Sequence, residues 1–146
     1  GMGANRAYNA RQKFDESLQQ RFKYVKFDFD KKVEREVLKQ HIEWYEFAML
    51  FRDAVNNYYQ FKNREVEGQI TTRDLKDIKT EIEDGILSDE KILCYEFIET
   101  KEPACLAHII SYTQQNNKNL SSKAKSLAKK FERAAYEMHP EMKENG

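Results

Sequence analysis

Two apolar patterns with helical spacing dominate the chain. The first links residues 3 or 4 apart near the end of the sequence: Leu120, Ala124, Leu127, Phe131, Ala134 and Met138. The second has the same spacing nearer the middle: Trp44, Phe47, Phe51, Ala54, Tyr58 and Phe61. An apolar stripe that repeats every ~3.5 residues must be buried against other helices. The patterns therefore predict an all-α fold, a single-domain bundle of five or six helices.

The longest predicted helix begins at Asp30, whose carboxylate can cap the first turn, and ends at Asn63 or Arg64. A helix of that length would measure about 50 Å. On a face beside its apolar stripe it carries a second apolar set: Leu38, Ile42, Tyr45, Met49 and Val55. A helix that is apolar on two faces lies at the centre of its bundle or is shared with another chain.

The start of the chain is predicted to form a helix over residues 4–25. Residues 26–30 alternate polar and apolar side chains, which hints at a strand. The stretch is too short to stand alone, so we interpret it as a connection. The length of the chain suits one domain, which we place over residues 2–140, with a flexible tail over residues 141–146.

Shorter helices are predicted after residue 64. Each is marked by a residue that favours a helix start or by one that stops a helix. The first begins after Thr71 or Thr72 and ends at Gly85. Ser88 caps the second, and Pro103 lies in the first turn of the third. The last helix runs from about Leu120 to His139 and is stopped by Pro140.

The charge of the chain is balanced overall but unevenly distributed. Charged residues make up 34% of the sequence and the formal net charge is zero. Residues 65–102 hold 5 Lys/Arg against 12 Asp/Glu, whereas residues 1–64 and 103–146 are net basic. The simpler interpretation is an acidic section packed beside basic ends. The alternative is an acidic face that meets a basic partner.

The remaining composition points to a cytoplasmic protein. Cys94 and Cys105 sit in apolar helical patterns without a Cys or His at metal-ligand spacing, so both are expected to be reduced thiols. No apolar run reaches the ~18 residues that a membrane span needs, and no signal peptide is visible. Gly1 precedes Met2 and is interpreted as the remnant of a cleaved tag. No membrane association is predicted.

Most catalytic signatures are absent from the sequence. It has no glycine-rich phosphate loop, no nucleophile elbow and no zinc-protease motif. The closest approach to a metal group is His41 with Glu43 and Glu46, but one helix brings too few of these ligands together. We therefore predict no metal and no cofactor, and we favour a non-catalytic protein over an enzyme.

One short motif suggests an alternative. Arg133 and His139 stand in the sequence Arg-Ala-Ala-Tyr-Glu-Met-His. An arginine and a histidine at this spacing in a small all-helical bundle resemble the HEPN ribonucleases. The resemblance implies that Arg133 binds the scissile RNA phosphate and that His139 acts in acid–base chemistry. Ala134 departs from the family, which often places a polar residue directly after the arginine.

Nucleic-acid binding is otherwise not expected. The short helices around Gly85 imitate a helix-turn-helix, but residues 89–96 carry three acids against one lysine and would be repelled by phosphates. The outer face of the last helix is basic: Lys123, Lys125, Lys129, Lys130 and Arg133. We interpret these side chains as a solvated helix surface, with an anionic partner as the alternative.

The abundance of aromatic residues suggests an interface. Tyr58, Tyr59 and Phe61 cluster at the end of the long helix, where shorter neighbours would leave them exposed unless another chain covers them. Trp44 and Phe51 on the same stripe complete the set of interface candidates. We predict a non-catalytic protein-interaction or regulatory module that binds a protein partner or forms a homodimer. A small-ligand pocket between helices is a further alternative.

Overall fold

The computed structural model describes residues 29–144. The chain separates into two compact units, residues 1–30 and residues 31–146. Every regular element of the described residues is a helix, which confirms the all-α prediction for that part. The helix predicted over residues 4–25 lies outside the described residues, as does most of the 26–30 stretch.

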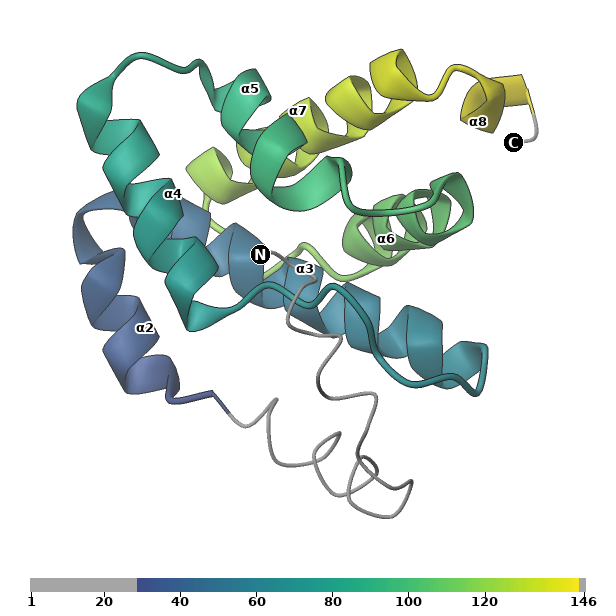
Figure 1. Cartoon of the computed structure of the whole chain (residues 1–146), viewed down its shortest axis with the longest axis horizontal. Coiled ribbons are helices and arrows are strands. Elements are labelled where there is room, and N and C mark those ends of the chain that lie inside the picture. The colour runs from purple at the N-terminus through teal and green to yellow at the C-terminus, as the bar shows by residue number, and fades with distance from the viewer. Residues whose placement is uncertain (1–28, 145–146) are drawn as a thin grey trace, which may run out of the picture. The chain divides into compact units, whose positions relative to one another are not determined.

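The centre of the bundle is α3 (Ile42–Phe61), which packs against α6 (Pro103–Gln115) and α7 (Ser122–Met138) (Figure 1). The two apolar stripes of the sequence meet there. Phe47 and Phe51 of α3 contact Phe131 of α7 and Phe97, with ring centroids 5.0 to 5.8 Å apart. Each of these four side chains is at most 1% exposed. Their burial explains why both helices need an unbroken apolar face.

The long helix predicted from Asp30 is wrong in its first part. The structure has α2 (Lys31–Val37), a 3-10 turn η3 (Lys39–His41), and only then α3. Leu38 leaves the helical conformation, with φ −107° and ψ 23°, while its side chain is fully buried. The bend lays α2 against α4 (Thr72–Asp84) rather than in line with α3. Packing against α4, not a local helix stop, decides this break.

The predicted caps of α4 and α5 (Asp89–Leu93) are confirmed. The Thr71 hydroxyl accepts from the Asp74 amide at 3.1 Å, and the Asp74 carboxylate accepts from the Thr71 amide at 2.8 Å. Gly85 ends α4 in the left-handed region, with φ 69°. Ser88 then caps α5 by accepting from the Lys91 amide at 3.2 Å. These bonds satisfy backbone amides at the helix starts that have no partner within the helix. For this reason the capping residues can be recognised from the sequence.

After α5 the chain continues as a π-helical turn, η4 (Cys94–Ile98), which the sequence analysis did not predict. The Glu99 amide donates to the Cys94 carbonyl, five residues earlier, at 2.9 Å. The wider turn places Phe97 and Ile98 in the core. Such turns are rare in helices and recur where packing or function demands an extra residue.

The C-terminal end also differs from the prediction. Ser121 caps α7, and the helix ends at Met138, two residues before Pro140. Where a flexible tail was expected from residue 141, the chain forms α8 (Glu141–Glu144). The side chain of Met142 is buried in the core cluster, and α8 packs on α6 and α7. Burial of this one apolar residue accounts for the extra turn of helix.

Candidate interaction surface on α6

Most of the interface candidates chosen from the sequence lie inside the chain. Trp44, Phe51, Tyr58 and Tyr59 are 1–5% exposed, so the end of α3 is not left uncovered as the sequence analysis expected. The reason is that α6 and the segment after α3 pack against the tyrosines: Tyr58 donates to Glu102 at 2.8 Å, and the Arg64 guanidinium lies over the Tyr59 ring. Phe61 alone is exposed, at 77%.

The helix beside Phe61 is unusual for this chain. Residues 103–117, which contain α6, include no Asp, Glu, Lys or Arg, although charged residues make up 34% of the sequence. Its inner side is buried in the core through Cys105, Leu106, Ile109, Ile110 and Thr113. Its outer side is nevertheless exposed through Ala104, Ala107, Ser111 and Gln114. Surface helices normally carry charged residues on their outer side, so an uncharged outer side is typical of a helix that is covered.

A groove runs along one flank of α6. It encloses about 400 Å³ between α6 and the end of α7 with α8, which Figure 1 shows side by side. Its far wall is formed by Tyr136 and Met142, and the Lys143 ammonium lies 5.6 Å from the Tyr136 ring centroid. Its other lining residues are Pro103, Ala104, Ala107, Ile110, Ser111, Gln114 and Glu141.

The opposite flank of α6 is formed by Phe61 and His108. Their ring centroids are 6.1 Å apart, and the His108 ring also packs edge-on against Tyr58. His108 Nε2 and Asn57 Oδ1 form a hydrogen bond of 2.7 Å. Burial lowers the pKa of His108, and nearby Lys62 lowers it further. His108 is therefore neutral at pH 7, so α6 carries no charge along this flank either.

We call these residues together the α6 surface: the outer side chains Ala104, Ala107, Ser111 and Gln114, with Phe61 on one flank and the groove walled by Tyr136 and Met142 on the other. The sequence analysis missed it. The signal available was the uncharged run 103–117, since periodicity alone identifies the buried side of a helix and not an apolar outer side.

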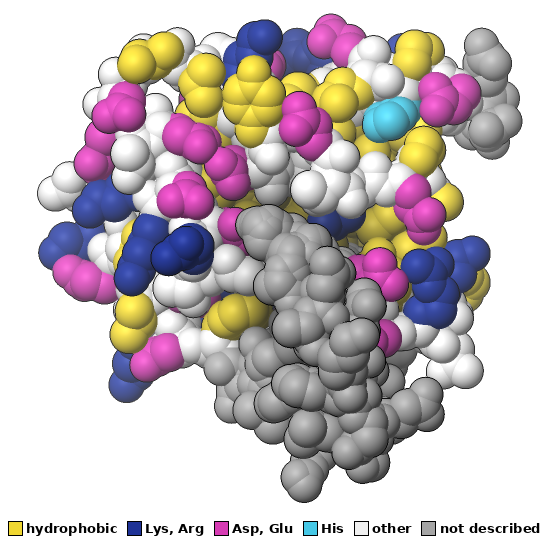
Figure 2. Space-filling model, in the orientation of Figure 1, with side chains coloured by type: hydrophobic (Ala, Val, Ile, Leu, Met, Phe, Trp, Pro, Cys, Tyr) yellow, Lys and Arg dark blue, Asp and Glu magenta, His cyan; other side chains and the backbone are white. Residues whose placement is uncertain are grey.

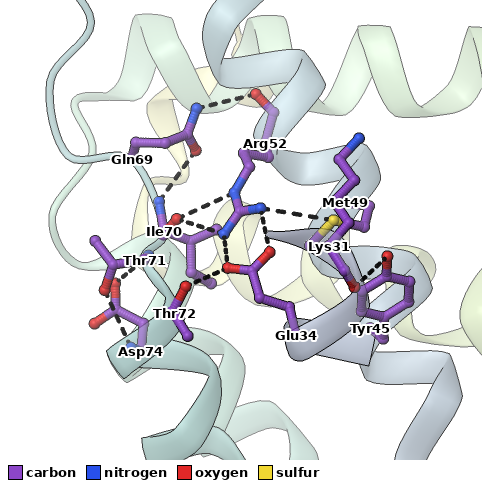
Figure 3. Close-up of polar contacts among 10 residues, drawn as sticks. All are labelled: Lys31, Glu34, Tyr45, Met49, Arg52, Gln69, Ile70, Thr71, Thr72 and Asp74. Atoms are coloured by element: carbon purple, nitrogen blue, oxygen red, sulfur yellow. Dashed lines mark hydrogen bonds and ion pairs between the residues drawn. The ribbon is translucent and has the colours of Figure 1, made fainter. Parts of the chain in front are cut away.

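The strongest polar cluster of the described residues is structural. Figure 3 shows Arg52 of α3 between Glu34 of α2 and the backbone before α4. Arg52 donates to both Glu34 carboxylate oxygens, at 2.8 and 2.9 Å, and to the Ile70 carbonyl at 3.1 and 3.2 Å. Thr72 donates to the same carboxylate at 2.6 Å. The cluster joins three elements around a fully buried acid.

The electrostatics of Glu34 follow from these partners. Burial raises the pKa of its carboxyl, but the hydrogen bonds from Arg52 and Thr72 outweigh burial, and the pKa ends below its ordinary value. Glu34 is therefore ionised at neutral pH and paired. The buried, paired Glu34 carboxylate holds α2 in place and is a structural group, not a reactive one.

A second buried charge fixes the segment between α3 and α4. The Lys101 ammonium donates to the Gly68 carbonyl and, at 3.1 Å, to the Thr100 hydroxyl. Burial lowers the pKa of Lys101. Gly68 has φ +65°, a conformation that strains other residues, and a Cβ there would lie 2.7 Å from the ammonium nitrogen and displace it. Both buried basic groups thus support the loop that leads into α4.

Acidic residues gather on α4 and η4. Figure 2 shows Asp and Glu side chains grouped over α4. The pKa of Glu96 is raised to about 9, mainly by burial, then by the hydrogen bond and charge of Glu81, with smaller contributions from Asp74 and Asp77. One oxygen of Glu81 is buried and lacks a hydrogen-bond partner. Glu96 is therefore protonated at neutral pH, next to the Glu81 carboxyl group.

The charge segregation of the sequence is partly resolved within the bundle. Lys130 of the basic α7 pairs with Asp89 of α5 at 3.0 Å. His41 contacts Glu83 at the end of α4, also at 3.0 Å. Glu46 accepts from the Ser121 amide at 2.8 Å and so supports the start of α7. The first two of these contacts agree with the interpretation that acidic and basic sections pack beside each other.

The residues considered for metal binding and catalysis are not brought together. His41 and Glu46 point to different partners, and the described residues contain no group of three or more candidate ligands for a metal. Arg133 is exposed on α7, whereas His139 follows its end and lies 3.6 Å from Glu141. No hydrogen bond or ion pair among the described residues joins Arg133 to His139. Two residues that are six positions apart on a helix lie about 9 Å apart along its axis.

Two broader findings complete the description. No protein-family model, curated protein or solved structure matches the chain significantly. Within residues 29–144, none of the helices combines the length and apolar character needed to cross a bilayer.

Proposed function

We propose that the protein is a cytoplasmic, non-catalytic protein-interaction or regulatory module, and that it binds its partner through the α6 surface. The observation that carries this proposal is that α6 lacks charged residues on every side but is covered on one side only. Leaving such a face in water forgoes the free energy of burying apolar area, about 25 cal/mol per Å².

The composition of the α6 surface suits a protein partner. Three of its four central side chains are small, which allows close approach of another backbone, and its flanks provide the exposed Phe61 and, in the groove, the partly buried Tyr136 and the edge of the buried Met142. Aromatic and methionine side chains are enriched at protein interfaces, and methionine adapts to irregular partners. Charged residues lie at the edge: Glu102 and Arg64 near Phe61, and Glu141 and Lys143 near the groove. An uncharged centre with charged residues at the rim is the usual anatomy of an interface.

The test is an affinity pull-down from native lysate with three proteins: wild type, Ala107→Glu and Ser126→Glu. Ala107 is at the centre of the α6 surface, and Ser126 is an exposed, small residue of α7 that serves as the matched control. We expect wild type and Ser126→Glu to retain a stoichiometric protein through high-salt washes. Ala107→Glu should retain at least tenfold less, because it buries an unpaired charge at the interface. Equal retention by Ala107→Glu would show that the α6 surface is not the binding site.

The ribonuclease alternative is tested with wild type and two further variants, Arg133→Ala and His139→Ala. RNA cleavage by the wild type that is lost in both Arg133→Ala and His139→Ala would replace the interaction proposal by an enzymatic one. Binding of RNA that falls steeply with salt, without cleavage, would instead point to the lysines of α7.

A further inference from the structure

We infer that the partner on the α6 surface is a second copy of this chain, so that two α6 helices pack across a two-fold axis. The inference rests on the proposed function, since it names the occupant of the same surface. The dimer is symmetric and its two α6 helices are antiparallel.

Charge selects self-association at this surface. In a two-fold interface the same patch faces itself, so a patch with charge of one sign repels its copy. The acidic residues of α4 and the lysines of α7 are therefore unsuited to it. The α6 surface has no charge at its centre, where His108 is neutral, and its Phe61 edge carries both signs through Lys62, Arg64 and Glu102. The net charge of the whole chain is zero, so no long-range repulsion keeps two copies apart.

The helix ends favour the antiparallel arrangement. A two-fold axis across the middle of α6 places the first turn of one helix, at Pro103, against the last turn of the other, at Gln115. The positive end of each helix dipole then faces the negative end of its copy. Ala107 lies near the axis, where a small side chain permits close contact. Ser111 and Gln114 are exposed and can form hydrogen bonds across the interface.

The position of Phe61 makes the arrangement specific. Phe61 packs against His108, which is one residue from Ile109, the midpoint of the 13-residue α6. A two-fold axis that lies in the interface plane, perpendicular to α6, reverses the direction of the helix. It leaves each flank at the same edge of the interface in both copies. The Phe61 rings of the two copies therefore meet at one edge, and the two grooves face each other at the opposite edge. Parallel helices would instead place Phe61 against the partner's groove.

The first experiment measures mass against concentration by sedimentation velocity, from about 1 to 300 µM, because small interfaces give weak dimers. We expect wild type and Ser126→Glu to approach twice the 17.4 kDa of the chain. Ala107→Glu should raise the dimer dissociation constant at least tenfold. Wild type that remains monomeric at 300 µM would overturn the inference. If wild type is monomeric but retains another protein in the pull-down, and Ala107→Glu does not retain it, the α6 surface is still supported as a binding site.

The second experiment uses Phe61→Cys. Unlike Ala107→Glu, this variant introduces no charge at the interface, and it leaves the core unchanged because Phe61 is exposed. Mild oxidation should give a disulfide-linked dimer on a non-reducing gel. Gln60→Cys is the matched control, since it is exposed on α3 but one position away. Wild type controls for the native thiols Cys94 and Cys105. A dimer by sedimentation without Phe61→Cys cross-linking would overturn the antiparallel arrangement.

Discussion

At the scale of single residues, the fold depends on one buried ion pair. Arg52 and Glu34 have side chains 6% and 0% exposed, and their hydrogen bonds join α2, α3 and the start of α4. Pairs of this kind are costly to break because the remaining charge stays buried, although an apolar pair of similar size can replace them. The pair therefore fixes the position of α2 and is not a source of net stability.

We predict that Arg52→Met destabilises the protein by about 3–5 kcal/mol, because it leaves the Glu34 carboxylate buried without its main partner. Urea unfolding followed by circular dichroism measures the change. The double variant Arg52→Met with Glu34→Leu should recover a large part of the loss, since no buried charge remains. Equal destabilisation by the single and double variants would contradict this account.

A second prediction concerns Glu96 and pH. Its pKa is raised from 4.5 to about 9 in the fold, so between these values the native state holds a proton that the unfolded state releases. This contribution to stability is complete below pH 4.5 and is lost as the pH rises towards 9. Glu96→Gln should therefore stabilise the protein at pH 8 by roughly 1–2 kcal/mol, a figure reduced because the group is partly exposed.

The measurement is the unfolding free energy at pH 5, 7 and 8.5. The gain from Glu96→Gln should increase with pH, whereas Glu99→Gln, an exposed residue next to the same turn, should change little. A gain that is the same at every pH would mean that the pKa of Glu96 is not raised in the fold.

At the scale of elements, α4 depends on signals within its own sequence. The reciprocal bonds between Thr71 and Asp74 satisfy two backbone groups at its start. We predict that Thr71→Ala destabilises the protein by about 1 kcal/mol, measured by thermal unfolding. Thr80 bonds the Lys76 carbonyl in the exposed middle of α4, so Thr80→Ala should be neutral. Similar losses from both variants would show that the effect is one of helix propensity and not of capping.

At the scale of the whole molecule, self-association links stability to concentration. A dimer that dissociates on unfolding has a midpoint temperature that rises with protein concentration. We predict a rise of a few degrees for wild type between about 5 and 200 µM, and no rise for Ala107→Glu. Differential scanning calorimetry at both concentrations measures it. A concentration-independent midpoint for wild type would argue against coupling between the α6 surface and the fold.

The fold was predicted best where the signal is local. The stripes of α3 and α7, the cap at Thr71 or Thr72, the glycine stop at Gly85 and the proline at the start of α6 all act within one or two helical turns. The interface candidates were predicted less well. Tyr58 and Tyr59 have the composition of an interface, but α6 and Arg64 already cover them. Aromatic content cannot distinguish burial within a chain from burial between chains.

The sequence by itself determined the helical class, the apolar faces and most helix ends, because each depends on neighbours within a few residues. Tertiary structure decided the bend at Leu38, the π-helical turn at Cys94–Ile98, the added helix α8 and the pairing of Arg52 with Glu34. It also decided which side of α6 stays open. These features arise from contacts between segments far apart in sequence, where matching shape and charge outweighs local preference.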